Sequence, residues 1–159
     1  MGRNLEIWRI AMVLAPTSLR SRIHAFPGDR SRNANWTLEQ QQEYIDAILR
    51  DRWVDTQVWM RTSGDDGFAR FGVVDGMRRL RTIWQFGDGT LPLSGSCDPI
   101  DGEVVAGMRY DELPEAVLAR FLAYEFAVFS FDGDDVVDVF ERVNRVAEPL
   151  GAIEHGNMT

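Results

Sequence analysis

The chain of 159 residues contains no lysine, one cysteine and two histidines. Without lysine, it cannot form a Schiff base through a lysine amine or bind phosphate through a P-loop lysine. The single Cys97 cannot form an internal disulfide, which agrees with a reducing compartment, and no histidine lies near it in sequence to activate it. Because the histidines are only His24 and His155, the latter in a predicted tail, we expect no internal histidine-metal nuclease centre.

Long hydrophobic runs are also missing. No stretch approaches about 20 uninterrupted apolar residues, so no membrane-spanning helix and no membrane partner are expected. Glu6 and Arg9 interrupt the apolar segment 5–14, which argues against a secretion signal and for a cytoplasmic protein. The apolar fraction of 45%, with five Trp and nine Phe, is sufficient for a core. We therefore predict one domain over residues 1–153 and a flexible tail over 154–159.

All 17 basic residues are arginines, and charge is unevenly distributed. Residues 1–82 carry a net charge of +3 and residues 83–159 a net charge of −11. This balance excludes nonspecific binding of duplex DNA over the whole surface. A local DNA contact through Arg20, Arg22, Arg30 and Arg32 stays open, and the competing interpretation is a solvated arginine-rich loop.

Local signals predict a series of helices and strands. Thr37 and Gln40 fit a capping box, and Tyr44, Ile45 and Ile48 follow at helical spacing, so a helix should run from Thr37 to about Arg52. Before this helix we expect a strand or short helix over 5–14 and a long loop over 17–35. After it we expect strands over 57–61, 68–74 and 124–129, helices over 77–86 and 114–122, and a loop over 90–107 with a short strand at Val104-Val105. A last helix should be capped by Asp134, with Val136, Val137, Phe140 and Val143 facing inward. This order predicts a mixed α/β fold in which a β-hairpin leads into a helix.

The segment Val73-Val74-Asp75-Gly76-Met77-Arg78-Arg79-Leu80 contains the best candidate site. An apolar strand enters a tight turn and a helix begins at once, so the amide groups and dipole of the helix start would attract an anion. Gly76 would let the backbone approach closely, and Arg78 and Arg79 carry planar guanidinium groups suited to phosphate. Asp75 would hold a hydrated Mg²⁺ beside that phosphate. The competing interpretation is an ordinary turn in which Asp75 caps the helix and the arginines are solvated.

This segment resembles the Asp-Gly-Gln-Gln-Arg signature of the N-terminal domain of GmrSD-type, modification-dependent restriction proteins, which have a ParB/sulfiredoxin-like fold. Three further segments resemble the family in the same order, over roughly residues 30–151. They are Arg32-Asn33-Ala34-Asn35-Trp36 with the helix that follows it, Asp111-Glu112-Leu113-Pro114, and Val139-Phe140-Glu141-Arg142-Val143-Asn144.

The resemblance implies a stand-alone domain of the restriction and phage-defence type that binds a nucleoside triphosphate with Mg²⁺. It implies that Arg32 and Arg79 bind phosphate and that Asp75, as the catalytic residue, orients metal or water. The residues assigned to nucleotide binding are Arg32, Gly76, Arg78, Arg79 and Asn144. The two signature glutamines are replaced by Met77 and Arg78, so any hydrolysis is expected to be weak.

Two other functions stay open. The acidic C-terminal half is compatible with a non-enzymatic module, from a phage or a bacterium, that binds a host protein through an acidic face. The arginines from Arg20 to Arg32 are compatible with a local DNA binder. Three single residues also have two interpretations each. His24 is either an exposed loop residue or a general base, and Glu125 is either an exposed strand residue or a buried partner of a site arginine. Trp36 either packs against the fold or stacks on a ligand.

Overall fold

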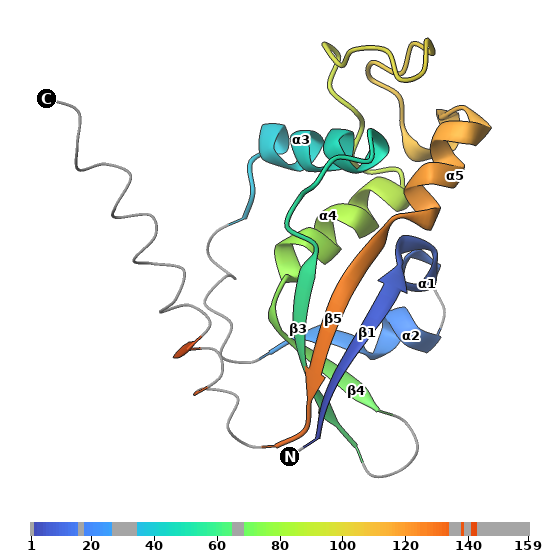
Figure 1. Ribbon diagram of the computed structural model, residues 1–159. Coiled ribbons are helices and arrows are strands. Elements are labelled where there is room, and N and C mark those ends of the chain that lie inside the picture. Colours follow the sequence, from blue (N-terminus) through green and yellow to red (C-terminus); the bar gives the residue numbers. More distant parts are fainter. Residues whose placement is uncertain are drawn as a thin grey trace, which may run out of the picture.

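The computed structural model describes residues 2–15, 18–26, 35–64, 69–133, 138 and 141–142. The described strands form one five-stranded sheet in the order β1-β5-β3-β4-β2 (Figure 1). Their bounds are Arg3–Arg9 for β1, Ile23–Ala25 for β2, Gln57–Ser63 for β3, Arg70–Asp75 for β4 and Glu125–Phe131 for β5. β1 pairs with β5, so the first and last described strands lie side by side in the sheet.

The sheet is mixed. β1 pairs with β5 and β3 with β4 in antiparallel fashion, whereas β5 pairs with β3 and β4 with β2 in parallel fashion. The predicted hairpin is therefore confirmed as β3–β4, with an irregularity in register between Trp59 and Met60. The mixed α/β class is confirmed as well.

Helices surround one face of the sheet. The bounds are Ile10–Leu14 for α1, Ser18–Arg22 for α2, Leu38–Leu49 for α3, Met77–Gly87 for α4 and Glu115–Ala123 for α5, with a short 3-10 turn at Tyr110–Glu112. The capping box of α3 is present: the Thr37 hydroxyl accepts a 3.2 Å hydrogen bond from the amide of Gln40, whose side-chain oxygen accepts one of 2.9 Å from the amide of Thr37. α3 ends at Leu49, slightly before the expected Arg52, with Arg50 as C-cap.

The core lies between this face and the helices. Val58 and Met60 of β3 and Phe126 and Val128 of β5 point into it, where they join the helix residues Ile10, Val13, Ile45, Ile48, Leu80, Phe86 and Phe121. Phe86 is fully buried and packs edge-to-face against Phe121, with ring centroids 5.2 Å apart. The apolar positions expected to face inward on α3, including Ile45, Ile48 and Leu49, agree with this core.

Several expectations need correction or completion. The segment 17–35 was predicted to be a loop, but it contains α2 and β2, because Ile23 is buried and β2 adds to β4 in parallel. Val104-Val105 is not a strand; the chain instead forms one isolated bridge between Ile100 and Glu103. Segment 5–14, predicted to be a strand or a short helix, contains both, since the strand β1 runs directly into α1.

The predicted last helix falls mostly outside the described residues. Asp138, Glu141 and Arg142 are described and are helical, whereas Asp134 and Asn144 lie outside the described part. Among the helices that the structure describes, none is long and apolar enough to cross a bilayer.

Candidate functional site

The turn between β4 and α4 is built around Gly76. β4 ends at Asp75, Gly76 has φ of +109°, and α4 begins at Met77. A Cβ atom at Gly76 would lie 3.0 Å from Cγ2 of Val58 and 3.2 Å from the main-chain oxygen of Gln57. Glycine is therefore required here because the backbone is left-handed and because it lies directly against β3. The close backbone approach expected at Gly76 is therefore the approach of this turn to β3.

The first turn of α4 carries no side-chain cap. Gly76 is the N-cap and can supply none, and in the described part of the chain no other side chain caps it. The first turn contains no acidic residue but does contain Arg78 and Arg79. Asp75 therefore does not act as the helix cap, contrary to the competing interpretation of the motif. The amide groups and the dipole of a helix start of this kind attract an anion.

Arg79 connects the start of α4 to the start of β3. Its side chain is only 15% exposed. One nitrogen donates a 2.7 Å hydrogen bond to the main-chain oxygen of Gln57, and the other is ion-paired with Asp55. The carboxylate of Asp75 lies 3.7 Å from the same guanidinium. Arg79 was predicted to bind phosphate, but in this structure its guanidinium already lies between two carboxylates and a carbonyl.

An aromatic pair joins this region to the segment that precedes α3. The rings of Trp36 and Tyr44 have centroids 5.0 Å apart and are tilted by 57°. The Tyr44 hydroxyl donates a 3.3 Å hydrogen bond to the main-chain oxygen of Asp55, the residue whose side chain holds Arg79. Burial raises the pKa of Tyr44 far above its ordinary value, so the phenol remains a neutral donor. A continuous series of contacts thus runs from Trp36 through Tyr44, Asp55 and Arg79 to Asp75.

The other residues predicted for this site are only partly located. Arg78 is half-buried on the first turn of α4, next to Met77, whose side chain is 7% exposed and belongs to the core. Arg32 and Asn144 lie outside the described residues. Within the described part, no group of three or more His, Cys, Asp or Glu side chains could hold a metal ion on its own. A Mg²⁺ at Asp75 would therefore need phosphate oxygens and water as most of its ligands.

Arg20 and Arg22, two of the arginines predicted to contact DNA, both make contacts within the fold. Arg20 donates to both carboxylate oxygens of Asp88 at 2.9 and 2.7 Å, and its guanidinium lies 5.1 Å from the centroid of the Trp84 ring. The hydrogen bond between them raises the pKa of Arg20 and lowers that of Asp88. Arg22 lies over the ring of Phe71 at 5.5 Å. Arg30 is outside the described residues.

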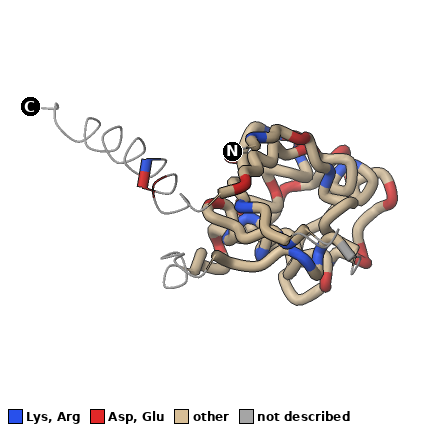
Figure 2. The backbone as a smooth tube through the Cα atoms, turned by 90° about the horizontal axis from the view of Figure 1, so that it is seen from below, with Lys and Arg blue, Asp and Glu red and all other residues tan. Residues whose placement is uncertain are grey.

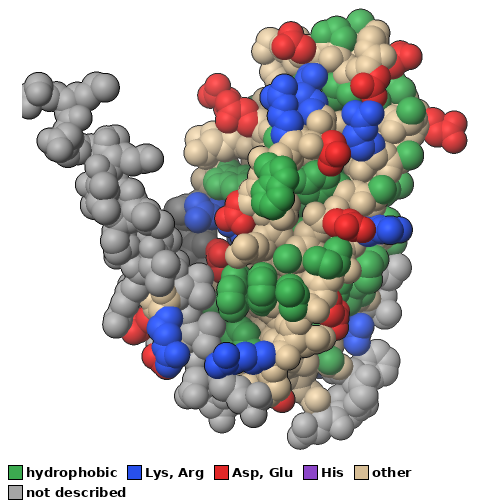
Figure 3. All heavy atoms as spheres, in the orientation of Figure 1, with side chains coloured by type: hydrophobic (Ala, Val, Ile, Leu, Met, Phe, Trp, Pro, Cys, Tyr) green, Lys and Arg blue, Asp and Glu red, His purple; other side chains and the backbone are tan. Residues whose placement is uncertain are grey.

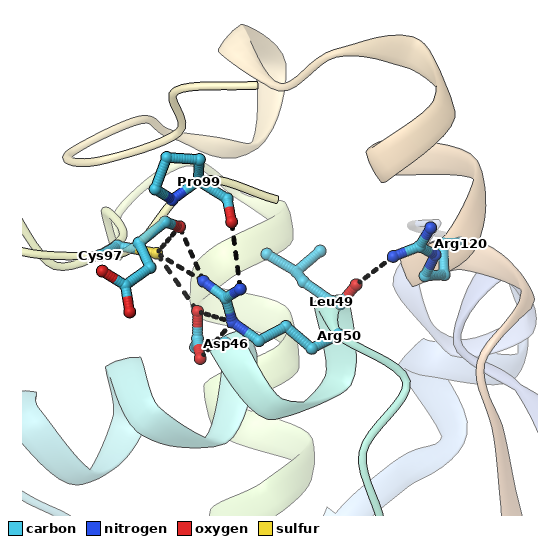
Figure 4. Close-up of polar contacts among 7 residues, drawn as sticks. Asp46, Leu49, Arg50, Cys97, Pro99 and Arg120 are labelled. Atoms are coloured by element: carbon cyan, nitrogen blue, oxygen red, sulfur yellow. Dashed lines mark hydrogen bonds and ion pairs between the residues drawn. The ribbon is translucent and has the colours of Figure 1, made fainter. Parts of the chain in front are cut away.

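A second polar cluster, which the sequence did not predict, joins α3 to the loop after α4 (Figure 4). Nε of Arg50 lies 2.9 Å from both carboxylate oxygens of Asp46, and its terminal nitrogens donate to the main-chain oxygens of Asp98 at 2.7 Å and Pro99 at 3.2 Å. The thiol of Cys97 donates to Asp46 at 3.2 Å. The i,i+4 spacing of Asp46 and Arg50 was the one signal available in the sequence.

This cluster borders an open pocket of about 260 Å³. The pocket is lined by Glu39, Gln42, Glu43, Asp46, Arg50, Arg52, Ser94, Ser96, Cys97 and Asp98. Burial, reinforced by the hydrogen bond to Asp46, raises the pKa of the Cys97 thiol above its ordinary value, so Cys97 is a poor nucleophile. Burial also acts to raise the pKa of Asp46, but the hydrogen bonds from Arg50 and Cys97 bring it below its ordinary value. The contacts fasten the 94–99 loop to α3.

Two smaller alternatives can be placed. His24 is exposed on β2. Glu125 is exposed on β5, where it forms a surface ion pair with Arg9 at 3.3 Å. The described ion-pair partner of Glu125 is therefore Arg9 and not Arg78 or Arg79 at the start of α4.

Charged residues of both signs are interleaved along much of the described backbone (Figure 2). The segment 98–115 departs from this pattern, with one arginine, Arg109, and six exposed acidic side chains. These are Asp98, Asp101, Glu103, Asp111, Glu112 and Glu115.

The chain matches no protein-family model, no curated protein and no solved structure. The ParB/sulfiredoxin-like assignment consequently stays a prediction drawn from the four sequence segments.

Proposed function

We propose that this chain is a ParB-like nucleotide-binding domain of the restriction and defence type, and that it binds the phosphates of a nucleoside triphosphate with Mg²⁺ at the start of α4. One observation carries the proposal. Trp36 and Asp75 belong to two motifs that lie 39 positions apart in the sequence, and the contacts through Tyr44, Asp55 and Arg79 join them. Such convergence is expected if both motifs serve one site.

Within this proposed site, the contacts of Arg79 favour a different division of roles. The amide groups of the first turn of α4 and the guanidinium of Arg78 would contact phosphate, and Arg32 stays a predicted phosphate ligand. Arg79 becomes a positioning residue, because its contacts with Asp55 and Gln57 fix the helix start. Asp75 would hold Mg²⁺ or orient water once phosphate oxygens complete the coordination.

Any hydrolysis at this site is expected to be slow. The first signature glutamine is replaced by Met77, whose side chain is in the core and offers no polar group to water or phosphate. Of the side chains described at this turn, the carboxylate of Asp75 is suited to orient a water molecule. We therefore expect nucleotide binding with a slow triphosphatase reaction at most.

A thermal-shift panel tests this function. Wild type is heated with ATP, GTP, CTP or UTP, each with and without Mg²⁺, beside the variants Arg78→Gln and Arg81→Gln. A ligand at about 100 times its Kd adds about 2.7 kcal/mol of stability, which for a domain of this size corresponds to roughly 5–10 °C in Tm. We expect such a shift in wild type and in Arg81→Gln, which is altered in the next turn of the same helix, and a much smaller one in Arg78→Gln. A panel without shifts contradicts the proposal.

The acidic segment 98–115 favours a second candidate function, a module that binds a host protein. Its six exposed acids fall within 18 residues that contain a single arginine. Such a surface suits a basic partner, and the complex should weaken as salt is added. A pull-down from host lysate, repeated with Asp101, Glu103 and Asp111 changed to Asn or Gln, tests this. A partner retained equally by both proteins, or no enriched partner at all, contradicts it.

A further inference from the structure

The face of the sheet away from the helices carries its own row of apolar side chains. Residues that alternate with core positions point to this outer face, among them Leu5 on β1, Phe129 on β5 and Trp59 on β3. Leu5 is the pairing partner of Phe129, and Phe129 that of Trp59. The rings of Trp59 and Phe129 are stacked, with centroids 4.5 Å apart and planes inclined by 13°.

Part of this row is uncovered. Leu5 and Ile7 are each 57% exposed, although they lie within a strand. Figure 3 shows hydrophobic side chains gathered over the strands on this face, while the described helices pack on the other one (Figure 1). A half-buried antiparallel strand normally turns polar side chains to solvent, so two exposed branched aliphatic residues on β1 indicate a binding surface.

The neighbouring part of the same face already buries apolar groups. Val74 is 2% exposed and Phe131 is 6% exposed, and both pack with Phe26 and Trp59 in a cluster separate from the main core. The row from Leu5 to Trp59 therefore continues into a second small core on the outer face. This makes the face a platform for packing.

We propose that the outer face of the sheet is the binding surface for the chain's own C-terminal segment, residues 134–159. Position is the first argument. β5 carries Phe129 and Phe131 of the face and ends at Phe131, and after Gly133 a further 26 residues follow. A segment that begins directly beside the platform has a high effective concentration there compared with any separate partner.

The pattern of the segment is the second argument. Asp138, Glu141 and Arg142 are helical and exposed, and Asp138 and Arg142 form an ion pair one turn apart. At 100° per residue these three fall on one side of a helix, and by the sequence pattern a helix through this segment would carry its apolar residues on the opposite side. Those residues are Val136, Val137, Phe140 and Val143.

Charge is the third argument. Residues 134–159 contain six acidic residues and two arginines, a net charge of −4. On the outer face, Arg3 of β1 and Arg61 of β3 flank Phe131 as its pairing partners. An acidic amphipathic segment therefore matches an apolar platform with basic residues at its border. The inference does not depend on nucleotide binding.

Crosslinking in the full chain tests the proposal. In a Cys97→Ser background, Leu5→Cys is combined with Phe140→Cys or, as matched control, with Glu141→Cys on the polar side of the same turn. A short bismaleimide reagent should give an intramolecular crosslink with Phe140→Cys and much less with Glu141→Cys. Crosslinked dimers would show that a second copy covers the face, and equal yields would show no oriented docking; either result overturns the proposal.

A second measurement does not require a crosslink to form. The rate at which a maleimide labels the Leu5→Cys, Cys97→Ser chain is compared after adding Phe140→Glu or, as control, Glu141→Gln. Leu5 is exposed at the sheet edge, so its replacement should not disturb the fold. We expect faster labelling with Phe140→Glu and an unchanged rate with Glu141→Gln. An unchanged rate in both, with circular dichroism showing a folded chain, overturns the proposal.

Discussion

The guanidinium of Arg79 donates a 2.7 Å hydrogen bond to the main-chain oxygen of Gln57, which fastens the first turn of α4 to the first residue of β3. The side chain of Asp55 is ion-paired with the same guanidinium, and its main-chain oxygen accepts a hydrogen bond from the Tyr44 hydroxyl. The geometry of the proposed site therefore depends on an arginine that need not touch the ligand.

Replacing Arg79 with Ala should weaken both the fold and the site. The change removes a hydrogen bond to a carbonyl and an ion pair with Asp55, whose side chain is 62% exposed, so we expect a loss of about 1–2 kcal/mol in the free energy of unfolding. Urea denaturation measures it. Asp55→Asn is the matched control and should lose less, because the bond to Gln57 remains. Full stability in Arg79→Ala would contradict the fastening role.

Gly76→Ala should destabilise the protein more than Gly89→Ala. Both glycines have positive φ, but a Cβ at Gly76 would lie 3.0 Å from Val58, while one at Gly89 meets nothing within 4 Å. Left-handed backbone alone costs about 1–2 kcal/mol for a residue with a side chain, and forced close packing adds roughly 1–3 kcal/mol. Urea denaturation of the two variants gives the difference directly. Equal losses would show that the approach of β3 to this turn is not tight.

The ion pair between Asp46 and Arg50 should make stability depend on pH. The folded-state pKa of Asp46 is below its ordinary value, so the pair stabilises the fold above the ordinary aspartate range and loses its effect as pH falls through the lowered pKa. At pH 7 we expect Asp46→Asn to be about 1 kcal/mol less stable than wild type. The difference should shrink as pH falls below about 3.9. A difference that does not change with pH would contradict this origin.

Cys97 should react slowly with thiol reagents at neutral pH. Burial and the hydrogen bond to Asp46 raise its pKa, so the thiolate fraction is small. The labelling rate of the native chain should therefore increase with pH beyond the range of an ordinary cysteine, whereas the urea-unfolded chain serves as control and should follow the ordinary profile. A native chain that labels as fast as the unfolded one at pH 7 would contradict the half-buried, hydrogen-bonded thiol.

The sequence predicted those parts of the fold whose signals are local. The capping box of Thr37 and Gln40, the hairpin and the start of α4 at Met77 each depend on a few consecutive residues, and each is present. β2 was missed because a three-residue strand shows no periodicity and its partner is β4, far along the chain. A parallel strand this short is recognised from its hydrogen-bonded partner in the fold and not from its own sequence.

The candidate site shows the same division. Asp75 and Gly76 were found from their turn chemistry, and their positions at the end of β4 and at the N-cap of α4 agree with that interpretation. The partner of Arg79 could not be predicted, because Asp55 lies 24 positions earlier and shares no motif with it. Arg20 was likewise expected to contact DNA or solvent, because its partner Asp88 lies 68 positions away in the sequence. Arginines without sequence context are consistent with either a ligand site or an internal ion pair.

The most direct test of the nucleotide site is isothermal titration of the nucleotide that gives the largest thermal shift, with and without Mg²⁺, into wild type, Asp75→Asn and Arg81→Gln. If the start of α4 binds phosphate and Asp75 holds the metal, wild type and Arg81→Gln will bind more tightly with Mg²⁺, and Asp75→Asn will lose that gain while it still binds the metal-free nucleotide. Binding that is the same in all three proteins, or no binding by the folded wild type, would contradict a nucleotide site at this turn.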